Sequence, residues 1–222
     1  MEFRVEAESL SRVTAKAAIL FVPKGADVAS LVKDAGPGFV GAARTVAARE
    51  TFTGAGGQVV ALHDKPGARI ETVVLAGIGD KGDADVLRTA AGEAIRCARD
   101  AGAKTVAAVL PDAKNAAAAA ETVVEGLRLG LYVFEGYKAD KTKRAVDAIT
   151  LLAPTAKLAA ARAGAAEGQI LADSVLLVRD LVDFERVHKT QLSRLPHVGR
   201  IQSSFALRDV VRRALPADLL IE

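Results

Sequence analysis

Three glycines form the first pattern that can do chemistry. Gly77, Gly79 and Gly82 have the G-x-G-x-x-G spacing, after a predicted strand and before a predicted helix. This pattern is typical of a dinucleotide-binding loop, in which glycines let the backbone approach a pyrophosphate at a helix N-terminus. However, Gly82 falls before the predicted helix, and Asp80 and Asp83 place negative charge where phosphates would lie. We therefore favour a strand-to-helix turn and keep nucleotide or ADP-ribose binding as an alternative.

The single cysteine is the second candidate for chemistry. Cys97 lies within a predicted helix between Arg96 and Arg99, and both arginines can lower the pKa of its thiol. We nevertheless expect a half-buried small residue rather than a nucleophile. One cysteine cannot form an internal disulfide, which fits a reducing cytoplasm.

The histidines and serines do not form a recognisable catalytic motif. His63, His188 and His197 are far apart, no H-E-x-x-H is present, and one cysteine cannot build a thiolate zinc site. No G-x-S-x-G marks a nucleophilic serine. The sequence therefore predicts no catalytic, cofactor-binding or metal-binding residue in this chain.

A basic segment with aromatic neighbours is a candidate nucleic-acid contact. Its members are Tyr132, Phe134, Tyr137, Lys138, Lys141, Lys143 and Arg144. Basic and aromatic side chains together can bind the backbone and stack on the bases of a nucleic acid. Asp140 and Asp147 interrupt the cluster, so we favour a solvated loop and keep DNA binding as an alternative.

The elements that must position these residues follow from hydrophobic periodicity and from turn residues. Strands are predicted at 3–7, 17–22, 58–62, 70–78, 105–110 and 145–152. Helices are predicted at 27–34, 40–49, 83–100, 115–135 and 156–179, with Asp83 or Asp85 capping the third. Strands alternate with helices from residue 58 onward, which predicts an α/β sandwich with helices on both faces of a largely parallel sheet. We expect the two N-terminal strands to add a mixed or antiparallel edge.

Composition excludes several classes of protein. Half of the 222 residues are hydrophobic and 26% are charged, which argues against intrinsic disorder. No apolar run approaches the roughly 18 residues that a membrane span needs. An acid at position 2 and the lack of an apolar N-terminal segment argue against a secretory signal. The net charge of +3 is too small to indicate nucleic-acid binding by itself. We expect a cytoplasmic protein with no membrane partner.

An ordered set of segments resembles a known family. The segments are Val73–Gly79, Leu87–Gly92, Glu125–Phe134, Tyr137–Lys138, Gly168–Val175 and Arg179–Val182. In this order they resemble the N-terminal domain of the leucyl aminopeptidase (cytosol aminopeptidase) family, over nearly all of residues 1–182. The resemblance implies a three-layer, macro-domain-like α/β fold in residues 1–155 and a long linker helix in residues 156–182.

The resemblance also implies what the rest of such a protein does. In the family, a larger catalytic domain uses two divalent metals, such as manganese or zinc, to release N-terminal amino acids from peptides. Its members are typically hexamers, and some bacterial members bind DNA. No catalytic residue of the family can be carried onto this chain. We therefore expect a non-catalytic domain that is inactive alone and serves assembly or regulation, with self-association or an aminopeptidase catalytic domain as its partner.

The last forty residues differ from the rest. Alanine is abundant up to residue 182 and scarce in residues 183–222, where the resemblance also stops. Our hypothesis is that residues 183–222 are an atypical tail, out of frame or otherwise foreign, on a shortened aminopeptidase. The preceding helix has many apolar residues, so we expect it to self-associate or to be covered by the tail through Leu181, Phe184 and Leu192.

Overall fold

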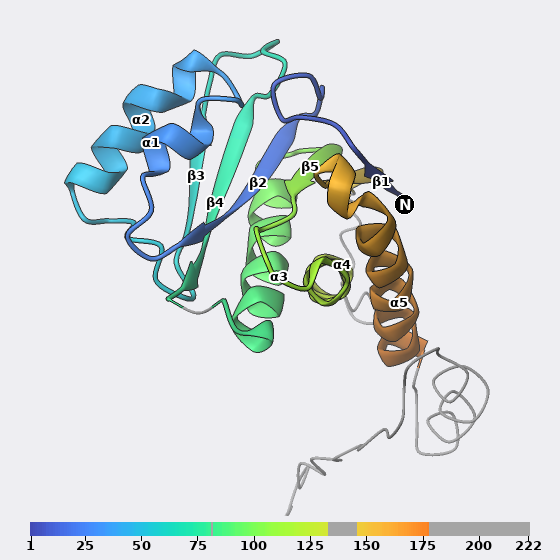
Figure 1. The fold of residues 1–222 in the computed structure, drawn as a ribbon. Helices are drawn as coiled ribbons and strands as arrows, with labels where there is room; N and C mark the ends of the chain where they lie inside the picture. The colour runs from blue at the N-terminus through green and yellow to red at the C-terminus, as the bar shows by residue number, and fades with distance from the viewer. Residues whose placement is uncertain (81, 133–145, 178–222) are drawn as a thin grey trace, which may run out of the picture.

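One mixed sheet of six strands organises residues 1–80, 82–132 and 146–177, which are the residues that the computed structural model describes (Figure 1). The strands are β1 (Glu2–Glu6), β2 (Ala17–Pro23), β3 (Val59–His63), β4 (Thr72–Gly79), β5 (Thr105–Val109) and β6 (Ala148–Leu152). The helices are α1 (Val28–Val32), α2 (Pro37–Ala48), α3 (Ala84–Asp100), α4 (Ala116–Gly130), the short 3-10 helix η1 (Thr155–Lys157) and α5 (Leu158–Leu177).

The strand order is β1-β6-β5-β2-β4-β3. All neighbouring pairs are parallel except β3 with β4, which is antiparallel with Val59 opposite Ala76. The expectation of a mixed edge from the two N-terminal strands was therefore wrong. β1 is a parallel edge strand beside β6, whereas β2 lies in the centre of the sheet because its residues are apolar on both faces.

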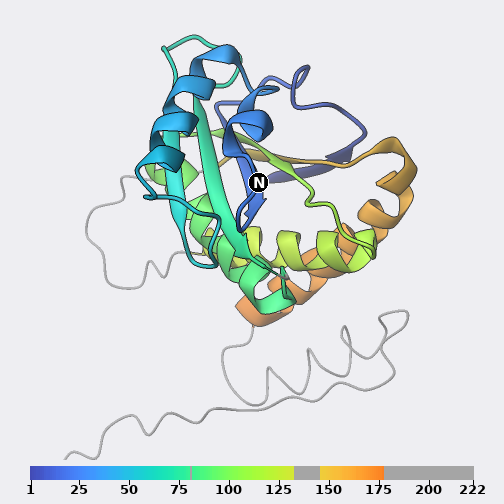
Figure 2. The same ribbon diagram turned by 60° about the vertical axis from the view of Figure 1, so that its left-hand side comes forward.

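The central strands divide the core into two halves. Ala17, Ile19 and Phe21 of β2 face one apolar cluster, which contains α3, α4 and α5. Ala18, Leu20 and Val22 face the other, which contains α1 and α2. Figure 2 shows these two helical layers on opposite sides of the sheet. The predicted three-layer α/β sandwich is confirmed.

The helix starts agree with local chemistry, with one exception. The Asp27 carboxylate accepts a hydrogen bond from the Ala29 N–H, and the Asn115 side chain accepts one from the Ala118 N–H, both at 3.1 Å. Asp83 is the N-cap residue of α3, but its side chain makes no capping hydrogen bond. The predicted capping interaction was therefore wrong there, although the start of the helix was correct.

Helix α4 lies unusually close to the helices on either side of it. A Cβ on Gly126 would lie 2.3 Å from the Arg88 carbonyl oxygen of α3. Cβ atoms on Gly164 and Gly168 of α5 would lie 1.9 and 2.3 Å from the carbonyl oxygens of Ala117 and Glu121. These distances are far below van der Waals contact, so only glycine permits this backbone-to-backbone packing.

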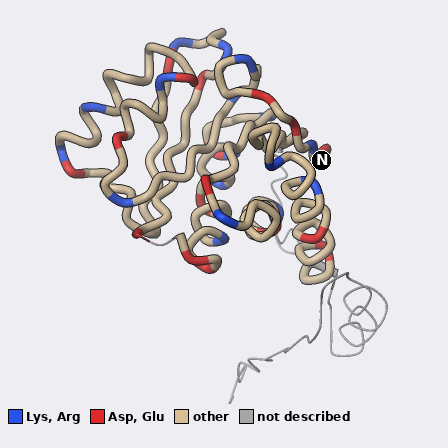
Figure 3. Tube along the Cα trace, viewed as in Figure 1, with Lys and Arg blue, Asp and Glu red and all other residues tan. Residues whose placement is uncertain are grey.

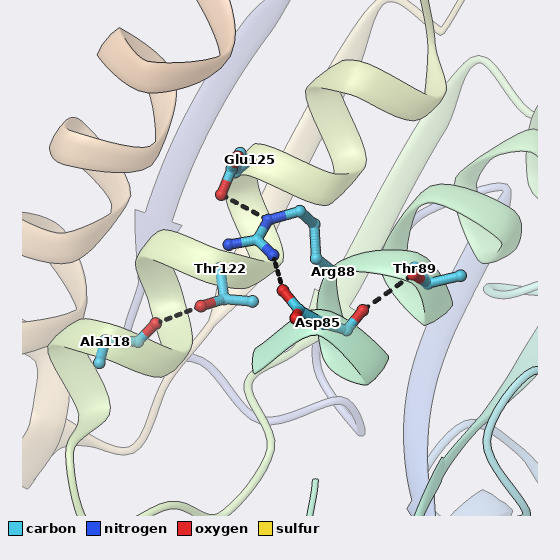
Figure 4. Close-up of polar contacts among 6 residues, drawn as sticks. All are labelled: Asp85, Arg88, Thr89, Ala118, Thr122 and Glu125. Carbon is cyan, nitrogen blue, oxygen red and sulfur yellow. Dashed lines mark hydrogen bonds and ion pairs between the residues drawn. The ribbon is translucent and has the colours of Figure 1, made fainter. Parts of the chain in front are cut away.

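Ion pairs join the same three helices. Arg88 of α3 contacts Glu125 of α4 through Nε at 2.7 Å and Asp85 of its own helix at 2.6 Å (Figure 4). Arg128 of α4 pairs with Asp173 of α5, with Nε 3.0 Å from the carboxylate. Since all these groups are at least partly exposed, we expect the pairs to fix the position of the helices more than to add stability.

One carboxylate lies in an unfavourable environment between α4 and α5. Partial burial raises the pKa of Glu121, and the negative charges of Glu167 and Glu125 raise it further. Elsewhere, the Glu71 carboxylate accepts hydrogen bonds from Lys16 and from the Gly67 N–H, which lower its pKa. The two groups therefore have opposite effects on the pH dependence of stability.

We predict that Gly164→Ala lowers the free energy of unfolding by about 2 kcal/mol, because the added methyl group would force α5 away from the α4 backbone. The control is Gly41→Ala in α2, where an added Cβ meets nothing within 4 Å. That variant should be neutral or more stable by up to about 1 kcal/mol, because alanine favours the helix. Urea unfolding of both variants gives the comparison. Equal effects at the two positions would contradict close packing at Gly164.

We predict that Glu121→Gln raises the melting temperature at pH 7 and that this gain disappears in acid. Below the unfolded-state value of 4.5, Glu121 is protonated in both states, so its ionisation no longer destabilises the fold. The matched variant Glu71→Gln should show the reverse sign. It loses stability at pH 7, and the loss shrinks as the pH falls through the lowered pKa of Glu71. Thermal melts from pH 3 to pH 7 measure both series, and a loss of stability in Glu121→Gln at pH 7 would refute the assignment.

Candidate functional site

The carboxyl ends of the parallel strands form the natural place for a site. The helices that follow β2 lie on one face of the sheet, whereas those that follow β4 and β5 lie on the other. Because β2 lies between β4 and β5, the chain leaves neighbouring strands in opposite directions there. In open α/β sheets, such a point leaves a crevice in which ligands bind. Two cavities, described below, lie along this edge.

The Gly77–Gly82 loop lies at this edge, but it has no free N–H groups at its first two glycines. The Gly77 N–H donates to the Gln58 carbonyl oxygen at 2.8 Å, and the Gly79 N–H donates to the Gly54 carbonyl oxygen at 2.9 Å. A Cβ on Gly77 would lie 2.1 Å from the Ala55 carbonyl oxygen. These glycines therefore accommodate a neighbouring loop. They do not offer the amide donors that a pyrophosphate needs.

That neighbouring loop, residues 53–57, is a feature that the sequence analysis missed. The Gln58 side-chain oxygen accepts hydrogen bonds from the N–H groups of Thr53 and Ala55, at 2.8 and 3.1 Å. Gly54 has a φ of +81°, and a Cβ there would lie 2.4 Å from the Pro23 carbonyl oxygen. The glycine-rich stretch therefore packs across the ends of β2 and β4, a role that the sequence analysis did not predict.

The first cavity, which we call the α4 cavity, has a volume of about 510 Å³. Its lining includes Ile78, Gly79, Asp80, Asp112, Lys114 and Asn115. The charged groups are largely paired: Lys24 lies 3.6 Å from Asp80, and Lys157 lies 2.5 Å from Asp112 and lowers its pKa. This mixture of paired acids gives no clear preference for an anion.

The second cavity, which we call the α1 cavity, has a volume of about 520 Å³ and lies across the sheet from the first. The residues that line it include Glu8, Leu20, Leu31, Asp34, Leu110 and Leu152. No motif in the sequence indicated it, because its walls come from five separate segments of the chain. Only the alternation of strands and helices, which predicts the carboxyl edge as a binding region, could have suggested it.

Cys97 does not have the environment of a nucleophile. Burial raises the pKa of its thiol, and the Asp100 carboxylate raises it further. Arg96 and Arg99 pair with the carboxylates of Glu93 and Asp100. The idea that both arginines lower the thiol pKa was therefore wrong, and the expectation of a half-buried residue is confirmed.

The remaining candidates do not meet in one place. His63 is exposed at the end of β3, where its Nδ1 lies 3.1 Å from Thr72 Oγ1. Among the residues that the structure describes, no group of three or more His, Cys, Asp or Glu could hold a metal ion. His188, His197, Lys81 and the cluster from Phe134 to Arg144 lie outside the described residues, and Tyr132 is exposed just after α4.

The charge distribution gives no separate indication of a nucleic-acid surface. Figure 3 shows basic and acidic residues interspersed along the outer helices and loops of the described chain. A nucleic-acid surface usually gathers basic residues on one face. In the same part of the chain, no helix combines the length and apolar character that crossing a bilayer requires.

Comparison with known sequences identifies the family. The profile of the cytosol aminopeptidase family, N-terminal domain, matches residues 9–141. A probable cytosol aminopeptidase of Geobacter sp. is 38% identical over 135 residues, which are 59% of this chain and 28% of that protein. One from Pseudomonas paraeruginosa is 33% identical, with 82% of this chain and 38% of that protein covered. One from Solibacter usitatus is 29% identical over 93% of this chain, so its alignment extends into residues 183–222.

Comparison with solved structures agrees on the fold. The bottromycin maturation enzyme BotP, in complex with Mn, is 26% identical with a TM-score of 0.55, over 76% of this chain and 32% of that chain. Tomato leucine aminopeptidase has a TM-score of 0.65 at 15% identity, over 80% and 37% of the two chains. The macrodomain of Thermus aquaticus DarG has a TM-score of 0.51 at 14% identity, over 68% and 98%. These last two likenesses show the macro-domain-like fold alone.

The extent of these matches defines what the chain represents. It spans between 28% and 41% of the length of the curated relatives that it matches. The matched profile covers more than half of the chain, and the sequence relatives are cytosol aminopeptidases. The chain belongs to the cytosol aminopeptidase family, and it corresponds to the N-terminal domain of that family.

Proposed function

We propose that this chain is a non-catalytic domain that assembles with, or regulates, a metal-dependent peptidase catalytic domain. In this proposal, residues 1–155 are the macro-like domain, residues 156–182 the linker helix and residues 183–222 an atypical tail. Release of N-terminal amino acids from peptides, and the two divalent metals that it requires, belong to the catalytic domain. The name of the cytosol aminopeptidase relatives supports a cytoplasmic location for this function.

The attachment of α5 is the observation that carries the proposal. Gly164 and Gly168 place this helix directly against the α4 backbone, and Asp173 pairs with Arg128. The helix is therefore fixed against α4 along most of its length. A domain that contacts α5 would be held in a defined position relative to the sheet. A loosely attached linker would not do this, because it would leave the two sides free to move independently.

The end of α5 supports self-association as a second part of the proposal. Ile170 and Val175 are 38% and 59% exposed, and Tyr132, shortly after α4, is 53% exposed. Because Arg128 near the end of α4 pairs with Asp173, this region of α4 lies beside the last turns of α5. Exposed large apolar side chains of this kind are typical of surfaces that contact another protein.

We predict that the chain associates with itself in a concentration-dependent way and that the double variant Ile170→Ser, Val175→Ser weakens this association. Light scattering of residues 1–222 measures this association, with Leu31→Ser on α1, where the side chain is 40% exposed, as the control. The same samples, with added Mn²⁺, should show no chelator-sensitive hydrolysis of a chromogenic leucine substrate, since the described residues hold no set of metal ligands. A monomer at every concentration, or hydrolysis that a chelator abolishes, would contradict the proposal.

Nucleotide binding is the alternative that the loop geometry disfavours, and glycine substitutions test it. Gly79 has a φ of +70° with the nearest backbone atom 3.7 Å from an added Cβ, so Gly79→Ala should cost about 1 kcal/mol through its conformation alone. Gly77→Ala should cost more, because its Cβ would overlap the Ala55 carbonyl group. Urea unfolding measures both, and calorimetry with NAD and ADP-ribose measures binding. Tight binding that Gly79→Ala abolishes would restore the nucleotide alternative.

A further inference from the structure

The two edge strands of the sheet differ in how they are protected. β1 carries the charged residues Glu2, Arg4 and Glu6, and its Val5 carbonyl oxygen accepts a hydrogen bond from Arg162 Nε at 3.4 Å. Charged side chains and covered backbone groups are common means of blocking an exposed edge. β3, at the other end of the strand order, has the sequence Val-Val-Ala-Leu-His, without a lysine, an acid or a proline (Figure 1). β3 therefore offers an edge that another strand can join.

The pairing of β3 with β4 defines which backbone groups lie on this edge. Just before β3, the Gly77 N–H donates to the Gln58 carbonyl oxygen at 2.8 Å, and just after it, the Asp64 N–H donates to the Glu71 carbonyl oxygen at 2.9 Å. Bonded pairs alternate along an antiparallel ladder. The even-numbered residues of β3 therefore bond to β4, whereas positions 59, 61 and 63 point their N–H and C=O groups away from it. Within the described ranges, no strand pairs with these outward groups.

The outward groups match those of a second copy of the same strand. In an antiparallel pair with a two-fold axis at Ala61, Ala61 lies opposite Ala61, and Val59 lies opposite His63 of the other copy. Each of these pairs exchanges two backbone hydrogen bonds. On the face that carries α2, Val60 lies opposite Leu62, so apolar side chains meet there and no like charges face one another. The edge is therefore complementary to itself, as a two-fold contact requires.

The charges beside the edge are complementary under the same axis. Lys65, just beyond one end of β3, is exposed and forms no ion pair with the described residues. At the other end, Gly56 lies against Val86 in the first turn of α3, 3.0 Å from a Cβ on the glycine, so Asp83 at the start of α3 lies near this end. Asp83 is exposed, and its carboxylate makes no capping hydrogen bond. Antiparallel pairing places the Lys65 end of each copy against the Asp83 end of the other, which favours this orientation.

We propose that two copies of the chain join their β3 edges antiparallel about Ala61, so that one continuous sheet runs through both. This contact is distinct from the association proposed for α5. That helix lies beside β1, at the opposite edge of the sheet, where Arg162 contacts the Val5 carbonyl group. The β3 contact therefore goes beyond the proposed function, and the two contacts can be tested separately.

Disulfide crosslinking tests the register of the β3 contact. In the full chain with Cys97→Ala, mild oxidation of Ala61→Cys should join two copies, because the Cα atoms of a bonded antiparallel pair lie about 5.5 Å apart, within disulfide range. Val59→Cys is the matched control. Its two copies would lie about 13 Å apart along the strands and should not crosslink, whereas adding His63→Cys should restore the crosslink. Crosslinking of Val59→Cys as fast as that of Ala61→Cys, or none with Ala61→Cys, would overturn the proposal.

A proline tests the backbone hydrogen bonds and separates this contact from that of α5. In the Ile170→Ser, Val175→Ser background, Ala61→Pro removes an outward N–H and leaves the bonds to β4 in place, as proline does on edge strands. It should weaken association about tenfold or more, whereas the control Ala61→Ser keeps the N–H. Light scattering measures association, and circular dichroism compares the folds. Equal association of the two variants, or a monomeric Ala61→Ser at every concentration, would refute the β3 contact without affecting that of α5.

Discussion

The contact of α4 with the backbones of α3 and α5 is the constraint on which the rest of this structure depends. Gly126 of α4 lets the Arg88 carbonyl group approach from α3, and Gly164 of α5 lets that helix approach the Ala117 carbonyl group of α4. Side chains larger than hydrogen would separate these helices, so the layer would no longer cover its face of the sheet. The alanines that surround these contacts also allow the helices to lie close together. Each alanine side chain is small, yet it still buries apolar surface. At this separation Arg88 of α3 pairs with Glu125 of α4.

This packing also affects which cavities form at the carboxyl edge of the sheet. With α3 and α4 fixed on one face and α1 on the other, the loops after β2, β4 and β5 diverge and leave the two cavities. The Gly79 N–H then donates to Gly54 in the loop at residues 53–57, and the Gly77 N–H donates to Gln58 just after that loop. A pattern that resembles a phosphate-binding loop is therefore used for internal packing. The shared fold with a macrodomain does not carry a ligand with it, because function depends on the groups that line the edge.

Much of the fold could be predicted from the sequence, because strong periodicity determines where elements occur. The runs at Ala17–Pro23 and Thr72–Gly79 are apolar on both faces, so a buried central position followed directly. The order of the strands could not be predicted in the same way. The assignment of the antiparallel edge to β3 rather than to β1 depends on long-range pairing that no local pattern encodes. The cavities could not be predicted from the sequence either, since Glu8, Leu31 and Asp34 come together only after folding. The partial burial of Cys97 was predicted, but the direction of its pKa shift was not, because Arg96 and Arg99 pair with carboxylates only in the folded chain.

The pairing of β1 with β6 has a consequence for how the protein is made. The sheet joins β1 to the last strand described, with Glu2 opposite Ala148, and no other strand of the described residues lies beside β1. During synthesis, the residues of β1 leave the ribosome before any partner exists, and they must wait until β6 has been translated. Chain entropy opposes so distant a contact until the intervening layers have formed. β1 is thus synthesised well before its partner, and until the two strands pair, the edge of β6 is open to a strand from another nascent chain.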